Sequence, residues 1–394
     1  MILAEGAQRL VLGIDASNLG PGGSMTHLTN VLAAAKPAEH GFARVRVWGG
    51  SAQLSRLRER PWLEKLAVPE LERGLFARLA WQRFRLPALA RAGCDVLFVP
   101  GGNARPGGFH PLVTMSRNML PFAWPELRRY GASLMTARLL LLRFGQSRTF
   151  AHADGLVFLT EYARQAVGRV ARLPARVAVI PHGVEERFRI PPRPPRALAE
   201  CSPERPLRAL YVSIVDVYKH QGHVARAVHA LRAEGLPITI DFVGPAYPPA
   251  LARFQATLRE LDPEGRALRY AGAVPFAKLH ELYAAAELFV FASSCENMPN
   301  VLLEGMAAGL PIACSNRGPM PEVLGDAGVR FDPERPAEIA AALRRLAEDA
   351  PLRGRLAAAA SERAREFSWE RCAEETFAFV ARTAREARSV SASR

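Results

Sequence analysis

Residues 288–315 read LFVFASSCENMPNVLLEGMAAGLPIACS, and this stretch contains one complete folding unit. Its first five residues, 288–292, are apolar and aromatic-rich, which is typical of a strand buried on both faces of a parallel sheet. Pro299 suits the first position of a helix, and Gly309 followed by a proline provides the stop signal. Residues 312–314 begin another apolar run. The stretch therefore predicts strand, loop, helix and strand in succession.

Similar apolar runs recur through both halves of the chain, separated by helical patterns. They are residues 10–14, 45–48, 96–99, 112–115, 156–159, 209–214, 238–243, 288–292 and 312–315. Such alternation is typical of βαβ units and parallel sheets. The proline-rich segment 190–196 cannot continue a sheet. The predicted fold class is α/β, with two Rossmann-like domains facing across a cleft: residues 1–190, a linker at 191–205 and residues 206–369.

The chain is basic, with a formal net charge of +14 at pH 7, and residues 51–150 hold 16 Lys or Arg against 6 Asp or Glu. Its five cysteines are scattered without a CxxC motif, which argues against a disulfide framework or a zinc site and indicates a reducing compartment. The first residues lack a signal-peptide pattern, and the apolar run 139–142 is too short to cross about 30 Å of hydrocarbon. We therefore expect a cytoplasmic location.

Two glutamates, Glu296 and Glu304, flank the start of the helix expected after Pro299. A helix N-terminus directs backbone N–H groups and the positive end of its dipole at the preceding loop, so a phosphate is favoured there. Carboxylates repel a phosphate, and beside one they are useful as acceptors for hydroxyl groups such as a sugar diol. The alternative is that Glu304 is a solvated helix residue and Glu296 only a partner of the helix dipole.

This stretch resembles the C-terminal half of the retaining GT-B glycosyltransferases of family 4, which carry Glu, seven residues, Glu. The match continues through residues 305–311, 321–323 and 325–328. The resemblance implies that Glu304 binds the ribose of a sugar nucleotide and that Glu296 lies beside the donor sugar. It also implies a last helix, near 370–394, that crosses back to the first domain. Between the glutamates, the residues expected to contact sugar and phosphate are Asn297, Met298, Pro299, Asn300 and Val301.

The resemblance assigns two further positions to the donor phosphates. Gly22 and Gly23 correspond to a glycine loop after the first strand, for which a plain tight turn is the alternative. Lys219 follows the strand expected at 209–214, at the sheet edge where open α/β sheets bind ligands, and corresponds to a lysine that neutralises the leaving diphosphate. The arginine that usually precedes this lysine by five residues is replaced here by Ile214.

Arg117 and Asn118 follow the strand expected at 112–115 and stand where many family members carry His-Asp. Either residue can hydrogen-bond a sugar hydroxyl, and a structural loop is the alternative. Val274 and Pro275 correspond by position to the loop whose backbone reads the nucleotide base. No Asp-x-Asp motif occurs, so we expect metal-independent transfer, in which fixed donors and the lysine stabilise the leaving group.

The expected activity is retaining transfer of a hexose-like sugar from a nucleotide diphosphate donor to a saccharide or lipid-linked saccharide, in bacterial cell-surface polysaccharide synthesis. The candidate catalytic residues are Glu296, Lys219, Asn118 and Arg117. No cofactor is expected besides the nucleotide-diphosphate sugar as co-substrate. The alternatives are a nucleotide-sugar epimerase or phosphorylase on the same fold, and a non-catalytic basic protein of membrane or nucleic-acid surfaces.

Two arginine-rich amphipathic segments, 70–91 and 126–148, are of the kind that lies in an anionic membrane interface. The alternative is an apolar stripe that faces the core beneath solvated arginines. Peripheral contact with the inner face of the plasma membrane is therefore an open alternative to a purely cytoplasmic location. No nucleic-acid partner is expected, since no motif beyond net charge supports one.

Overall fold

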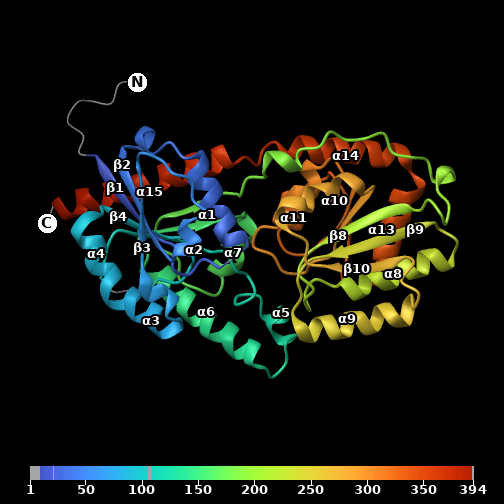
Figure 1. Cartoon of the computed structure of the whole chain (residues 1–394), viewed down its shortest axis with the longest axis horizontal. Helices are drawn as coiled ribbons and strands as arrows, with labels where there is room; N and C mark the ends of the chain where they lie inside the picture. Colours follow the sequence, from blue (N-terminus) through green and yellow to red (C-terminus); the bar gives the residue numbers. More distant parts are fainter. Residues whose placement is uncertain (1–8, 21, 105–107, 393–394) are drawn as a thin grey trace. The chain divides into compact units, whose positions relative to one another are not determined.

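The computed structural model describes residues 9–20, 22–104 and 108–392. Within these residues the chain forms two compact units, each built on its own parallel sheet (Figure 1). The first unit takes the chain up to Phe122, then Leu134–Gly183, and finally the segment that begins at Trp369. The second unit contains Ala123–Ser133 and Val184–Ser368. The α/β class predicted from the sequence is confirmed.

The first unit has a seven-stranded sheet in the order β3-β2-β1-β4-β5-β6-β7, and all of its pairings are parallel. Its central strands are buried on both faces, as their continuous apolar sequences require. The strands are β1 (Leu10–Asp15), β2 (Phe42–Gly49), β3 (Leu63–Ala67), β4 (Val96–Val99), β5 (Leu112–Met115), β6 (Gly155–Phe158) and β7 (Val177–Val179).

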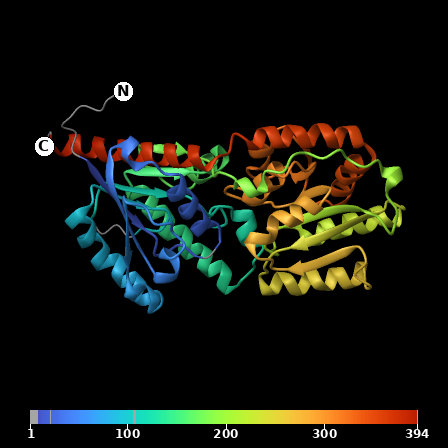
Figure 2. The ribbon, with the colours of Figure 1, turned by 45° about the horizontal axis from the view of Figure 1, so that its top comes forward.

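Helices connect and cover this sheet. They are α1 (Gly23–Ala34), α2 (Ser51–Leu54), α3 (Leu75–Ala80), a π turn (Trp81–Arg85), α4 (Leu86–Gly93), α6 (Leu134–His152), α7 (Glu161–Gly168) and α15 (Trp369–Ala392), with 3-10 turns at Pro37–His40 and Pro69–Glu72. The last helix, α15, contacts α1 and β4, and it runs along the first unit in both ribbon views (Figures 1 and 2).

The second unit has a six-stranded sheet in the order β10-β9-β8-β11-β12-β13, also parallel in every pairing. Its strands are β8 (Leu207–Val212), β9 (Ile238–Val243), β10 (Leu268–Gly272), β11 (Leu288–Phe291), β12 (Ile312–Ser315) and β13 (Val329–Phe331). Its helices are α5 (Trp124–Arg128), α8 (Gln221–Ala233), α9 (Pro248–Leu261), α10 (Leu279–Ala285), α11 (Asn300–Ala307), α12 (Met320–Leu324), α13 (Pro336–Glu348) and α14 (Ala350–Ala364), with 3-10 turns at Glu186–Phe188, Leu198–Glu200 and Phe276–Lys278.

The stretch that opened the sequence analysis folds as predicted into β11, a loop, α11 and β12. Gly305 allows α11 to lie directly on the sheet, because a Cβ there would come 2.6 Å from the ring of Phe289. Gly309 ends the helix with a φ of +60°, and a Cβ there would lie 2.7 Å from the backbone nitrogen of Pro192. Pro299 precedes the first helical residue rather than occupying its first position.

The secondary structure differs from the sequence prediction at three further places. The segment 126–148 is not one helix, because Gly131 adopts a φ of +60° and separates α5 in the second unit from α6 in the first. The strand expected at 209–214 ends at Val212, so Ile214 lies in the following loop. The edge strands β3, β7 and β13 were not predicted, because they are short and half-exposed and so lack a buried apolar run.

The proline-rich segment after the first unit is packed on the second unit. Arg193 donates hydrogen bonds to the backbone carbonyls of Ala284 and Ala286, and Arg196 forms an ion pair with Glu287 at 2.6 Å. The segment expected as the linker 191–205 therefore belongs to the second compact unit, and the first unit's central part ends at Gly183.

Candidate active site

The carboxyl ends of β8 and β11 bring together an ion pair between Lys219 and Glu296. Both side chains are largely enclosed, with 6% of Lys219 and 15% of Glu296 exposed. The Lys219 ammonium also lies 5.2 Å from the ring centre of Phe291, at the end of β11. The two residues come from loops at neighbouring strands of one sheet, which is where open parallel sheets bind ligands.

The loop from Asn297 to Pro299 and the first turn of α11 continue this edge. Asn297 and Met298 are buried, whereas Asn300 and Val301 are half-buried at the start of the helix. The loop after β12 passes close by at Gly318, whose φ of +61° favours glycine, and a Cβ there would be in ordinary contact, 3.8 Å from the Glu296 nitrogen. The predicted residues between the two glutamates thus lie around one helix N-terminus, which attracts anions.

Glu304 is buried on α11, and the hydroxyl of Tyr283 donates a hydrogen bond of 2.8 Å to an oxygen of its carboxyl group. Burial raises the pKa of Glu304 to about 8, although the hydrogen bond from Tyr283 and the charge of Arg187 lower it. The same Tyr283 hydroxyl lies 3.3 Å from the carbonyl oxygen of Val301. Glu304 is therefore not a solvated helix residue but a carboxyl group held in a fixed orientation.

Val274 and Pro275 follow β10 and lead into a short 3-10 turn. The ring of Phe276 in this turn lies 4.2 Å from the guanidinium of Arg187, and Arg187 forms an ion pair of 2.8 Å with Glu185. Because Glu185 and Arg187 both influence the pKa of Glu304, this loop and the buried glutamate share one neighbourhood. No pattern in the sequence pointed to Tyr283, Glu185 or Arg187.

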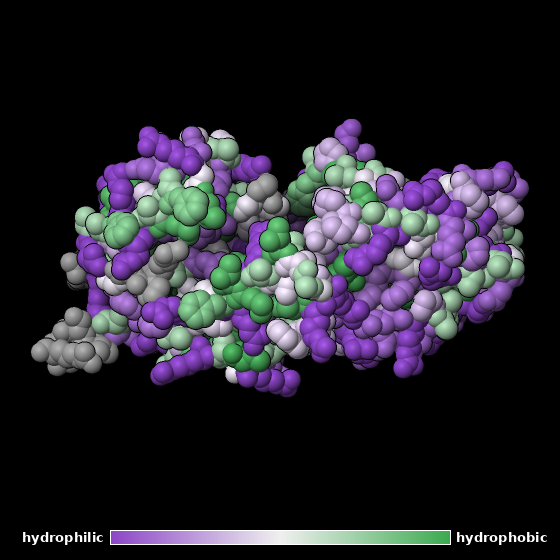
Figure 3. Space-filling model, turned by 90° about the horizontal axis from the view of Figure 1, so that it is seen from below, coloured by the Kyte–Doolittle hydropathy of each residue, from purple (hydrophilic) through white to green (hydrophobic). Residues whose placement is uncertain are grey.

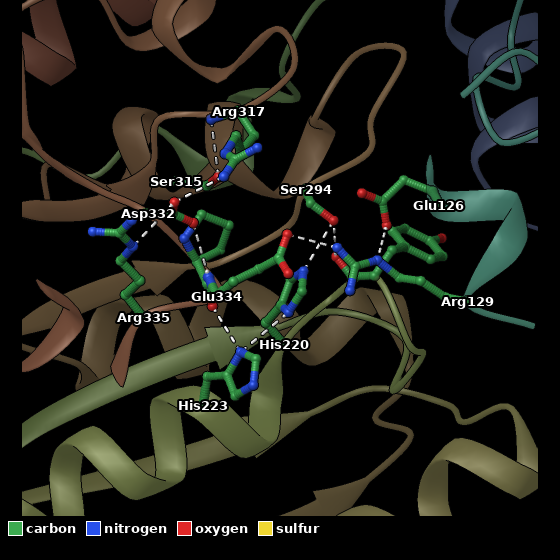
Figure 4. A network of polar contacts seen from close by, with 12 residues as sticks. Glu126, Arg129, His220, His223, Ser294, Ser315, Arg317, Asp332, Glu334 and Arg335 are labelled. Carbon is green, nitrogen blue, oxygen red and sulfur yellow. Dashed lines mark hydrogen bonds and ion pairs between the residues drawn. The ribbon is translucent and has the colours of Figure 1, made fainter. Parts of the chain in front are cut away.

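A polar network surrounds the loops after β11, β12 and β13 (Figure 4). His220, which has a positive φ of 52°, lies 2.9 Å from the Ser294 hydroxyl through Nε2. Burial and then the charge of Arg129 lower the pKa of His220 to about 4, so its ring is neutral at pH 7. Arg317 binds Asp332 at 2.8 Å on the other side of the network.

The short α5 segment is fastened to the second unit by the same network. Arg129 forms ion pairs of 2.7 Å with Glu126 and 2.6 Å with Glu334 (Figure 4). The neighbouring Tyr130 hydroxyl donates a 3.0 Å hydrogen bond to Asp216. Glu334 follows β13 and Asp216 follows β8, so the segment reaches loops at two strands. Sequence reasoning missed this arrangement entirely.

In the first unit, Arg117 follows β5 and meets the glycine loop, as its guanidinium donates a 2.7 Å hydrogen bond to the carbonyl oxygen of Gly23. Desolvation lowers the pKa of Arg117 to about 10, which leaves it charged at neutral pH. Position 22 requires a glycine, because its φ of +106° just before α1 is rarely adopted by other residues. Asn118 instead accepts a hydrogen bond from the backbone of Leu120, the geometry of a structural turn.

Buried aromatic rings lie behind the start of α1. The rings of His27 and His182 are 4.7 Å apart, and Trp369 at the start of α15 lies 5.6 Å from His182. Burial, with Arg117 nearby, holds the pKa of His27 well below its usual range. The two buried histidine rings therefore pack beneath the start of α15 and are not surface groups.

Among the described residues, no group of three or more His, Cys, Asp or Glu side chains is arranged to hold a metal ion. All five cysteines are free. The metal-independent transfer expected from the sequence therefore remains a prediction. The candidate site of the second unit consists of Lys219, Glu296, the start of α11 and Glu304. In the first unit, taken by itself, the predicted site residues that lie together are Arg117 and the glycine loop.

Comparisons with known proteins show what the chain is similar to. The family described as "Glycosyl transferases group 1" matches residues 206–349. The chain is 40% identical over 109 residues to the O-antigen chain mannosyltransferase B of Escherichia coli, covering 28% of this chain and 29% of that protein. It is 31% identical over 249 residues to the D-inositol 3-phosphate glycosyltransferase of a Nocardioides species, covering 59% and 54%. The chain thus spans about half, or less, of the length of these relatives.

Solved structures extend the likeness to the whole chain. Sucrose-phosphate synthase from Thermosynechococcus elongatus has a TM-score of 0.72 at 17% identity, covering 98% of this chain and 100% of that one. HepE of Anabaena, in complex with UDP and glucose, has a TM-score of 0.66 at 18% identity with the same coverage. At these identities the likeness concerns the fold alone. The chain therefore contains a glycosyl transferases group 1 domain, at residues 206–349, and has the GT-B fold of glycosyltransferases.

Proposed function

We propose that this protein is a retaining, metal-independent glycosyltransferase of family 4 that moves a hexose-like sugar from a nucleotide diphosphate to an acceptor hydroxyl. The proposal rests on the residues gathered at the carboxyl ends of the strands in the second unit. There an enclosed cation, Lys219, lies beside Glu296, and a buried carboxyl, Glu304, is held by Tyr283. A cation, a helix N-terminus and two carboxyl groups match the phosphates and hydroxyls of a sugar nucleotide.

Each residue then has a distinct task. Lys219 and the start of α11 stabilise the charge that develops on the leaving diphosphate, which is electrostatic preorganisation. Glu304 binds the ribose, and Glu296 is freed from Lys219 to accept hydroxyl groups of the donor sugar. The bond between the anomeric carbon and the phosphate oxygen breaks, a bond to the acceptor oxygen forms on the same face, and the acceptor's proton passes to the departing phosphate.

The donor class is supported by structural relatives. HepE of Anabaena was solved with UDP and with UDP-glucose. The mannosyltransferase of Escherichia coli acts on an O-antigen chain, as its name states. We extend these to the present chain as a nucleotide-diphosphate sugar donor and a saccharide or lipid-linked saccharide acceptor, used in bacterial cell-surface polysaccharide synthesis.

We also propose peripheral contact with the inner face of the plasma membrane, through α3, the π turn and α6 of the first unit. Apolar side chains there are exposed, with Phe76 at 87% and Leu134 at 92%. Figure 3, seen from the side on which α3 and α6 lie, shows apolar residues among hydrophilic ones. The exposed arginines on these segments are Arg83, Arg85, Arg138 and Arg148. None of the helices in the described part of the chain is long and apolar enough to span a bilayer.

Donor binding is the direct test of the proposed activity. Purified protein is screened by thermal shift against UDP, GDP and ADP sugars, because a bound ligand raises the unfolding temperature by mass action. We expect one nucleotide class to stabilise the wild type and the Glu281→Ala control, which removes an exposed glutamate of α10, but not Glu304→Ala. No shift with any donor would overturn the assignment. Release of nucleotide that requires an added acceptor would reject an epimerase.

A further inference from the structure

The second unit has a cavity at the end of its sheet opposite to the end where Lys219 lies. Its volume is about 510 Å³, and its walls include Leu207 at the start of β8, Glu287 just before β11 and Pro311 just before β12. The strands are parallel, so these positions mark their amino ends, whereas the candidate active site is at their carboxyl ends. The helix α11, with eight residues, spans roughly 12 Å between the two edges. One small ligand therefore does not occupy both places.

The walls of this cavity are strongly basic. Its charged residues are five arginines and two glutamates, which leaves three positive charges in excess; they are Arg193, Arg196, Arg205, Arg208, Arg353, Glu204 and Glu287. The remaining walls are mainly apolar and come from Pro194, Pro195, Leu310, Pro311 and Ala357. A volume within the range of roughly 300–1,000 Å³ that holds small molecules, with apolar walls and a few convergent charges, is typical of a ligand site.

Part of this charge has a structural task. Arg353 is buried and donates to the carbonyl oxygens of Leu346, Ala347 and Arg196, which fixes the proline-rich segment on α14. Carbonyl oxygens bear no net charge, so these hydrogen bonds leave the positive charge uncompensated. The carboxylate of Glu287 forms its closest ion pair with Arg196, at 2.6 Å.

Two arginines at the cavity are not explained by that task. The side chain of Arg208 is 55% exposed. It lies 3.7 Å from Glu287, but that carboxylate is already bound more closely by Arg196. Arg205 makes no ion pair or side-chain hydrogen bond within the described part of the chain, and Glu204 beside it accepts from Ser202 at 2.8 Å. Both residues line the cavity. Guanidinium groups bind phosphate through paired N–H donors.

We propose that this cavity binds a phosphorylated small molecule of about the size of a sugar bisphosphate, through Arg205 and Arg208, separately from the sugar-nucleotide site. The excess positive charge selects an anion with more than one negative charge, and the proline and leucine walls accommodate its carbon skeleton. The buried Arg353 and the carbonyl-bound Arg193 add a fixed positive field to the cavity.

Calorimetric titration with fructose 1,6-bisphosphate, at an ionic strength of about 0.15 M to suppress general surface binding, tests this site. We expect one saturable site in the wild type, and an affinity at least about tenfold weaker in Arg205→Ala/Arg208→Ala, which loses two charge-assisted contacts. The matched control is Arg259→Ala/Arg345→Ala, which removes two exposed arginines that do not line this cavity. Its affinity stays within about twofold of the wild type, if the cavity and not the net charge binds the ligand.

A third variant separates this inference from the proposed catalytic function. Lys219→Ala removes the cation of the candidate active site and retains bisphosphate binding if the second cavity is the site. Binding that disappears in Lys219→Ala and persists in Arg205→Ala/Arg208→Ala overturns the proposal, as does equal loss in both arginine pairs or no heat at millimolar ligand. Arg205→Gln/Arg208→Gln repeats the measurement if thermal unfolding shows that the alanine pair does not fold.

Discussion

The Lys219 ammonium is enclosed by the protein and forms an ion pair with Glu296 across the carboxyl ends of β8 and β11. The cation assigned to the leaving diphosphate is thus held by the carboxylate assigned to the donor sugar. A donor that binds here must exchange this ion pair for its own contacts, phosphate with Lys219 and hydroxyl with Glu296. The pair keeps both charges satisfied until that exchange takes place.

Substitution of either partner tests this relationship. Lys219→Met leaves the Glu296 carboxylate without its cation, and we expect it to lower the free energy of unfolding by about 3 kcal/mol. The double variant Lys219→Met/Glu296→Gln removes both charges and is expected to recover most of that loss while transferase activity stays absent. Urea unfolding and a transfer assay measure the two effects. If the double variant is destabilised by the sum of the losses in Lys219→Met and in Glu296→Gln, the two residues do not interact.

A substitution at Ile214 is expected to strengthen donor binding rather than weaken it. It stands where the resembled family places a second phosphate-binding arginine, its side chain is 36% exposed, and its backbone carbonyl accepts a 2.8 Å hydrogen bond from Gln221 that a substitution preserves. We expect Ile214→Arg to tighten binding of the nucleotide-sugar donor by about tenfold, an effect that weakens as salt is added. Calorimetry compares it with Ile214→Gln, which adds a polar side chain without a charge. Equal affinities for the two variants would contradict the assignment of this loop to the diphosphate.

Glu304 predicts how stability depends on pH. Its pKa is raised from 4.5 to about 8 in the folded protein, so between these values the native state retains a proton that the unfolded state has lost. The free energy of unfolding therefore falls as the pH rises from 5 to 8, by up to a few kcal/mol from this group, at about 1.4 kcal/mol per unit of pKa shift. Glu304→Gln still accepts from Tyr283 but does not titrate, so we expect its stability to fall less over the same interval. Urea unfolding at pH 5 and pH 8 measures the difference.

The control for this experiment is Glu281→Gln, at an exposed glutamate of α10. It is expected to follow the wild type across the interval. If Glu304→Gln and the wild type lose the same stability between pH 5 and pH 8, the carboxyl group is ionised in the folded protein and the raised pKa is wrong.

The sequence predicted the parts of the site that are local. The apolar runs of the central strands and the helix signals around Pro299 and Gly309 correctly located β11, α11 and β12, because both faces of these strands are buried. Contacts between distant residues were beyond its reach. Tyr283 precedes Glu304 by 21 residues, and Arg129 and Glu334 are 205 residues apart. A periodic pattern carries no information about such pairs, since they depend on how separate elements pack.

Gly305 connects the packing of α11 to the stability of the second unit. A Cβ at this position would lie 2.6 Å from the ring of Phe289, which is fully buried. We expect Gly305→Ala to lower the free energy of unfolding by about 1–3 kcal/mol, despite the better helix propensity of alanine. Gly222→Ala in α8 is the matched change, because the nearest atom to its Cβ is 3.9 Å away, and it is expected to be neutral or stabilising. Thermal unfolding of both variants decides whether close contact or backbone entropy dominates.

The exposed phenylalanines of the first unit predict lipid binding. Phe76 is 87% exposed and Phe84 is 71% exposed, so removing them costs no core packing, whereas in a membrane interface each buries an aromatic ring. We expect Phe76→Ser/Phe84→Ser to bind vesicles that contain phosphatidylglycerol at least about tenfold more weakly, at an unchanged unfolding temperature. Co-sedimentation with vesicles measures the bound fraction.

Charge and apolar contact are separated by the choice of vesicle and control. Vesicles of phosphatidylcholine alone are expected to bind the wild type more weakly, since the neighbouring Arg73 and Arg83 are exposed and each basic residue near an anionic surface contributes about 1 kcal/mol. Val170→Ser removes an apolar side chain that is 44% exposed and lies outside α3, the π turn and α6, and it is expected to bind like the wild type. If the phenylalanine pair also binds like the wild type, the exposed rings do not contact lipid. Phe76 and Phe84 would then be available to a different partner, because exposed apolar patches commonly mark interaction sites.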